Sequence, residues 1–187
     1  PDLDAIRRVG IPFWLAGGYG SHAQLKVALA EGAQGIQVGS VFALAEESDA
    51  SYRTGVGHTA WLVRLQSELP NLRAALGWLE ANGEAALSVQ LTGALNGFWY
   101  FRGHFSEGRT WLKRALEPRP SNVSPAYLAR ALQIAGELAH YQGDSPEAVP
   151  LLLESLELCR EAGDDWGTAF GRFMLGIVAE DGADYDE

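Results

Sequence analysis

The spacing of apolar residues along the chain changes near residue 57. From Trp61 to Leu79, apolar residues recur at intervals of three and four, the pattern of a helix with one buried face. Asn82-Gly83 ends this first stretch, and Pro70 leaves open whether it is one helix or two. The same period predicts further helices over residues 84–102, 105–117, 125–142, 145–162 and 165–180.

Before residue 50, short apolar runs alternate with glycine turns, which favours strands joined by a helix. A strand, a crossover helix and a second strand form a β-α-β unit, whose strands should be parallel. Residues 50–57 fit neither pattern and are interpreted as a linker. The elements expected before it are a strand over 11–16, a helix over 21–31, a strand over 35–39 and a short helix over 40–47.

A repeat of 40 residues runs through the helical part. The segment 103–107 (Gly-His-Phe-Ser-Glu) aligns with 143–147 (Gly-Asp-Ser-Pro-Glu) and with 183–187 (Ala-Asp-Tyr-Asp-Glu). The same shift pairs Leu112 with Leu152. This recurrence predicts one structural unit that is used several times.

Each unit reads as a helix, a tight glycine turn and an antiparallel helix, as in tetratricopeptide-like arrays. The apolar stripes are too wide to be buried within one hairpin, so the next hairpin must cover them. Gly93, Gly136 and Gly176 are expected where paired helices approach most closely. The segment 118–125 carries the residues that lengthen the period beyond the usual repeat length.

The charge of the chain argues against nucleic acid and membranes as partners. The formal net charge is −10, of which −2 falls on residues 1–57 (four basic, six acidic) and −8 on residues 58–187 (ten basic, eighteen acidic). Neither part has a basic surface for phosphates or anionic lipids. The single Cys159, with no secretion signal and no long apolar run, indicates a cytoplasmic protein. The chain ends within a repeat, so we expect a segment of a longer protein.

Residues 58–187 resemble the helical-repeat region of STAND-class signal-transducing ATPases, including LuxR-type transcription regulators. The resemblance rests on Trp61-Leu62 with Asn71-Leu72-Arg73-Ala74-Ala75-Leu76-Gly77-Trp78, and on the run from Phe98 to Arg109. It implies repeats that restrain an ATPase and sense an inducer or partner. No Gly-Lys-Ser/Thr phosphate loop occurs in this chain, so ATP hydrolysis is not carried over.

Residues 11–49 resemble the last strand-helix units of the FMN barrel of nitronate monooxygenases (2-nitropropane dioxygenases). The resemblance is carried by Leu15-Ala16-Gly17-Gly18-Tyr19-Gly20, by residues 28–40 and by Glu46-Glu47-Ser48. It implies that Gly17, Gly18, Gly39 and Ser40 hold the FMN phosphate through backbone N–H groups at a helix start. A closed barrel needs about 250 residues, and the family's catalytic histidine falls upstream of this chain. We therefore expect no competent flavin site here.

Other candidate chemistry in the sequence has simpler structural explanations. The histidines, His104 and His140 among them, show no metal-ligand spacing and are interpreted as surface or capping residues. Cys159 is interpreted as a small buried hydrophobe. In the aromatic run Phe98-Trp99-Tyr100-Phe101, at least two side chains must face a core. Acidic residues from Glu154 to Asp165 are interpreted as a solvated face, with an acidic groove for a basic peptide as the alternative.

The sequence therefore predicts a mainly α fold of tetratricopeptide-like antiparallel helix hairpins, preceded by a small β-α-β fragment of the TIM-barrel type. The predicted domains are a barrel fragment over 1–49, a linker over 50–57 and a repeat domain over 58–187. We expect a protein-interaction or regulatory scaffold that binds a protein or peptide on its concave face. The alternative is a fragment of an FMN-dependent nitronate monooxygenase. No catalytic residue and no metal site are predicted.

Overall fold

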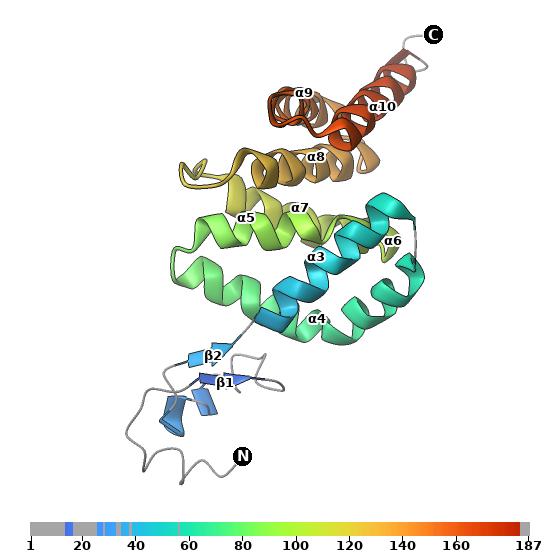
Figure 1. Ribbon diagram of the computed structural model, residues 1–187. Helices are drawn as coiled ribbons and strands as arrows, with labels where there is room; N and C mark the ends of the chain where they lie inside the picture. Colours follow the sequence, from blue (N-terminus) through green and yellow to red (C-terminus); the bar gives the residue numbers. More distant parts are fainter. Residues whose placement is uncertain are drawn as a thin grey trace.

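The computed structural model describes residues 14–16, 26–27, 29–32, 35–37, 39–55 and 57–183. Within these residues the chain is mainly helical, as the sequence predicts, and the helices stack in chain order toward the C-terminal end (Figure 1). No helix in the described part is long and apolar enough to cross a membrane. The helices are α3 (Gly39–Thr54), α4 (His58–Ala81), α5 (Ala85–Ala94), α6 (Asn96–Phe101), α7 (Phe105–Leu116), α8 (Pro125–Tyr141), α9 (Ser145–Ala162) and α10 (Asp165–Ala183).

Two short strands precede the helices. Strand β1 (Trp14–Ala16) pairs in parallel with β2 (Gly35–Gln37), with Trp14 opposite Gly35 and Ala16 opposite Gln37. The carboxyl ends of both strands therefore lie at the same edge of the pair. The structure describes helical backbone at residues 26–27 and 29–30, between the two strands.

One turn design joins most of the successive helices. Gly83, Gly103, Gly143 and Gly163 all have φ between 68° and 78°, and each lies one or two positions after the last residue of a helix. After each glycine, the next N–H donates to a carbonyl five residues earlier, which closes the helix end. At Asp144 and Asp164 that next residue also caps the following helix, since its side chain accepts from Glu147 N and Gly167 N, respectively.

One apolar core runs through the stack. It extends from Leu44 on α3 to Leu138 on α8, and a second cluster continues it where Leu152 meets Met174 and Val178. Helices α8 and α9 pack as a hairpin, and α5 and α7 both contact α8 from the preceding hairpin. Each hairpin therefore covers the apolar face of its neighbour, as expected from the width of the stripes.

The structure differs from the predicted helix boundaries at two points, and it answers the question that Pro70 left open. The helix expected over 84–102 bends at Leu95, because the Thr92 carbonyl accepts from Leu95 N and from the buried Trp99 indole N–H (3.2 Å). Helix α4 continues through Pro70, which lies on an exposed face where water can bond the freed carbonyl. Residues 50–54, interpreted as part of a linker, are the last turn of α3.

The three repeat glycines do not share one role. A Cβ atom on Gly136 would lie 2.7 Å from Leu152 Cγ and 3.1 Å from the Ala148 carbonyl oxygen, and one on Gly93 would lie 3.3 Å from Ala131 N. Both glycines therefore mark close helix contacts, as predicted. Nothing lies within 4 Å of the same position on Gly176, so the prediction for Gly176 is wrong.

This difference predicts opposite effects of one substitution at repeat-equivalent positions. Gly136→Ala forces α8 and α9 apart and should lower the free energy of unfolding by about 1–3 kcal/mol. Gly176→Ala adds helix propensity without a clash and should raise it by up to about 1 kcal/mol. Urea unfolding of both variants beside the parent chain measures the contrast. Equal effects at the two positions would contradict the packing.

Candidate functional site

The four residues predicted to hold an FMN phosphate are only partly described. Gly17 and Gly18 follow β1 and lie outside the described residues. Gly39 and Ser40 form the first turn of α3, two residues after β2 ends at Gln37. A helix start behind a strand end is the backbone arrangement that binds phosphates in many folds. Phosphate binding by these residues stays a prediction.

A better-defined surface is formed by the first helices of the successive hairpins. Helices α5 and α6, α8, and the start of α10 make up this surface, which we call the first-helix face. Helix α3 lies across it and crosses in front of α4, α5 and α6 in Figure 1. Polar side chains of α3 reach α5 at Gln90, α8 at Arg130 and α10 at Trp166.

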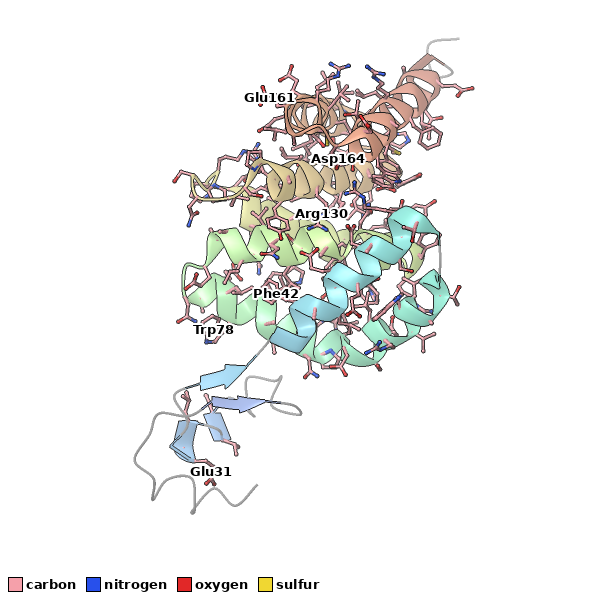
Figure 2. The ribbon with its side chains drawn as sticks, in the orientation of Figure 1. Glu31, Phe42, Trp78, Arg130, Glu161 and Asp164 are labelled. Carbon is pink, nitrogen blue, oxygen red and sulfur yellow. The ribbon has the colours of Figure 1, made fainter. Side chains whose placement is uncertain are left out.

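Arg130 is the centre of the contact between α3 and α8. Its Nη1 donates to Asp49 Oδ2 at 2.7 Å and to Glu46 Oε2 at 3.1 Å, and its Nη2 donates to both carboxylate oxygens of Glu46 at 3.1–3.2 Å. Figure 2 labels Arg130 on α8. Gln90 Nε2 donates to Glu46 Oε1 at 3.1 Å. The side chains of Arg130 and Asp49 are only 13% and 6% exposed. Acidic residues on α3 are thus matched to one buried guanidinium on α8.

Burial dominates the electrostatics of this contact. Loss of solvent raises the pKa of Asp49 above its ordinary value, although the positive charge of Arg130 acts in the opposite direction. A buried ion pair of this kind contributes little net stability, because desolvation offsets the attraction. Its stronger effect is on orientation, since misplacing either partner leaves a buried charge unpaired.

A second polar anchor holds the C-terminal end of α3. Arg53 Nη2 donates to Asp164 Oδ1 at 2.6 Å, and its guanidinium carbon lies 4.7 Å from the ring centre of Trp166. Asp164 lies where α9 meets α10 (Figure 2). The ring of Tyr52 packs edge-on against Trp166 and Phe101, with centroids 6.0 and 6.1 Å apart. Helix α3 therefore has its acidic end on α8 and its basic end on α10.

An ionisable group is buried on α8. Glu137 is 2% exposed, and its Oε2 has no hydrogen-bond partner among the described residues. Burial raises the pKa of Glu137 to about 7. Burial, and then the charge of Glu137, also raise the pKa of Tyr52 on α3. No local sequence pattern distinguishes this glutamate from a solvated one.

The histidine interpretation is wrong for His140. It is 7% exposed, and its Nε2 lies 3.2 Å from Asp181 Oδ2 on α10, so it is a buried residue rather than a surface one. His104 is the N-cap residue of α7, without a capping hydrogen bond from its side chain, and its ring lies tilted against Phe98 with the ring centroids 5.2 Å apart. The described residues contain no cluster of three or more metal-ligating side chains.

Two other interpretations are confirmed. Cys159 is 2% exposed, and burial raises the pKa of its thiol, as expected for a small hydrophobe. In the aromatic run, Phe98 and Trp99 are fully buried, whereas Phe101 is 52% exposed.

The opposite side of the stack carries two cavities at equivalent positions. One, of about 310 Å³, lies between α4, α5 and α7 and includes Leu76 and Trp111 in its wall. The other, of about 320 Å³, lies between α7, α8 and α9 and includes Leu116 and Leu151, each 40 residues further on. The first is mainly apolar and the second is rimmed by charges. The two cavities therefore lie at equivalent positions of the repeat, but their walls differ in polarity.

The burial of Glu137 predicts a pH-dependent stability. Between pH 4.5 and about 7 the folded chain keeps a proton on Glu137 that the unfolded chain releases, so stability falls as the pH rises. The loss reaches about 3 kcal/mol above pH 7. Glu137→Gln should therefore be as stable as the parent chain at pH 4 and more stable at pH 8 in urea unfolding. Glu157→Gln, an exposed carboxylate on α9, is the matched control, and parallel pH curves for parent and Glu137→Gln would disprove the assignment.

Comparison with known proteins finds two unrelated classes. The family model of nitronate monooxygenase matches residues 3–56. Curated relatives are candidate HTH-type transcriptional regulators from Mycobacterium bovis and from two strains of Mycobacterium tuberculosis, each 32% identical over 114 residues. These alignments cover 57% of this chain and 13% of each relative, so the chain spans a small part of their length. No solved structure matches the chain significantly.

Proposed function

We propose that residues 58–183 form a tetratricopeptide-like repeat scaffold that binds a protein or peptide partner on its first-helix face. The observation that supports this most is an arginine–glutamate ion pair that joins successive hairpins at two places, with the two arginines 36 residues apart. Arg73 on α4 donates to both carboxylate oxygens of Glu107 at 2.7 Å, and Arg109 on α7 pairs with Glu147. Glu107 and Glu147 are 40 residues apart and both lie in the first turn of a second helix.

A recurring contact of this kind fixes how each hairpin sits on the one before it. Hydrogen bonds from Arg73 hold the pKa of Glu107 below its ordinary value, and Arg114 and Arg119 add further pairs, with Glu80 and Glu154. Exposed pairs contribute little stability individually, but a bidentate pair restricts geometry. A rigid array with one continuous face of first helices is the form in which repeat proteins present a binding surface.

The regulatory part of the proposal comes from the relatives. They are described as HTH-type transcriptional regulators, and a repeat region of the STAND or LuxR type would there sense an inducer or partner in the cytoplasm. Nucleotide hydrolysis and DNA binding would belong to other parts of such a protein. The function proposed for this chain is sensing by protein contact.

The binding function is testable with a library of amphipathic helical peptides. Binders should protect amides of α5, α6 and α8 in hydrogen exchange rather than those of α7 and α9. Tyr141→Ala, which removes a 42% exposed ring from α8, should weaken binding at least tenfold. Trp78→Ala, which removes a 37% exposed ring from α4, should leave it unchanged. Protection confined to α7 and α9 would contradict the proposal.

A second candidate function is favoured by the match of residues 3–56 to nitronate monooxygenase. The chain would then derive from an FMN-dependent oxidoreductase that acts on nitronates, with Gly17, Gly18, Gly39 and Ser40 as the phosphate loops. Two paired strands leave most of a barrel unbuilt, so the fragment should not bind FMN by itself.

Titration of the chain with FMN, followed by flavin fluorescence, separates the two functions. We expect no saturable binding. Saturable binding that is lost in Gly39→Val, but kept in Gly77→Val on α4, would favour the flavin function instead. Gly77 is a suitable control because a side chain there meets nothing within 4 Å.

A further inference from the structure

We infer that α3 is an intramolecular ligand of the first-helix face, and that the external partner is a helix with the same order of charges. That order is an acidic pair three residues apart, then an aromatic residue and an arginine one turn later. The inference rests on the proposed scaffold function and specifies both the partner class and what holds the face closed.

The side of α3 that is buried is unusually polar for a permanent core helix. Among the described side chains of α3, the fully buried ones are Leu44, Ala45, Ser48, Asp49 and Ser51, and Phe42 packs partly buried against the same core. Burial of apolar area is the main source of packing stability, and α3 supplies little of it. Helices α5 and α8 bury more large apolar side chains, namely Val89 and Leu91 on α5 and Leu132, Ile134 and Leu138 on α8, beside polar residues such as Thr92 and Gln133. The contact of α3 with α8 and α10 rests mainly on charged and aromatic side chains, and we expect it to open while the array stays folded.

The charges fix one direction of binding. Glu46 and Asp49 meet Arg130 on α8, whereas Arg53 meets Asp164 between α9 and α10. A helix bound the other way round would bring its acidic pair to Asp164 and its arginine to Arg130. Like charges would then face each other at both ends, which strongly disfavours that arrangement. The face thus selects a helix with acidic and basic ends in this order.

The face also offers an acceptor that α3 leaves unused. Glu137 Oε2 is buried on α8 without a hydrogen-bond partner among the described residues. A buried polar atom without a partner is costly, and a ligand that supplies the partner recovers that cost. A partner helix that forms a hydrogen bond with Glu137 Oε2 would therefore bind better than α3 binds.

The attachment of α3 explains why it occupies the face by default. Gly55 and Gly57, with φ of 74° and 70°, lie between α3 and α4, so the tether is short. A short tether gives α3 an effective concentration in the millimolar range. An external helix must bind the first-helix face tightly enough to displace the tethered α3, so the face is open to a partner only when α3 has left it.

A labelled peptide of residues 39–54 tests the inference on the full chain. Binding to the parent chain should be weak. It should strengthen at least tenfold when the chain carries E46Q/D49N, which loosens its own α3 and leaves the face intact. The same two changes placed in the peptide should abolish the gain. Arg130→Gln in the E46Q/D49N chain should also abolish it, whereas Arg130→Lys should keep part of it.

A charge reversal distinguishes a lost ion pair from a misfolded chain, because a folded variant should bind a peptide of the opposite charge. Arg130→Glu should not bind the natural peptide but should bind a peptide with E46K/D49K, and circular dichroism checks that each chain stays helical. Equal peptide binding by the parent and the E46Q/D49N chain would overturn the inference. A dimer of the parent chain that dissociates in the Arg130→Gln variant would also overturn the inference, because the first-helix face would then bind α3 of a second copy. If library peptides still protect α8 while the α3 peptide does not bind, the scaffold function stands and the inference alone fails.

Discussion

The structure depends on one packing constraint: no hairpin of this array can bury its own apolar side chains. The close approach of Gly136 to Leu152 brings α8 onto α9, and α5 and α7 then cover the other side of α8. Because each contact is shared between neighbours, the order of the helices in space follows their order in the chain. This constraint also leaves one row of first helices, a continuous surface that no single hairpin could form.

Helix α3 shows that a boundary between sequence families is not always a structural boundary. The family match to nitronate monooxygenase extends to residue 56, and α3 lies within it. Nevertheless, Leu44 and Ala45 belong to the same apolar core as α4, α5 and α8, and Asp49 is paired with Arg130 on α8. Whatever the origin of α3, its present environment is the repeat array.

The local parts of this fold could be predicted from the sequence, because their causes are local. A glycine with positive φ ends four of the helices, and glycine is the residue that adopts this conformation without strain. Helix periods and the 40-residue shift follow from the same short-range pattern. The bend at Leu95 could not be predicted, since it depends on a hydrogen bond from the Trp99 indole N–H to the Thr92 carbonyl, seven residues earlier. Residues 50–54 were interpreted as a linker because their sequence is polar, whereas they form the end of α3, one side of which packs against other helices.

The candidate site belongs to the part that sequence could not supply. Glu46 and Asp49 meet Arg130 across 81 to 84 residues, and Arg53 meets Asp164 across 111. No period links these positions, and each looks like an ordinary solvated charge in its own segment. Desolvation makes such contacts poor sources of stability, but it makes an incorrect match expensive. A surface built on them is therefore better suited to discriminating between ligands than to holding one permanently, which is the property that a gated interaction face requires.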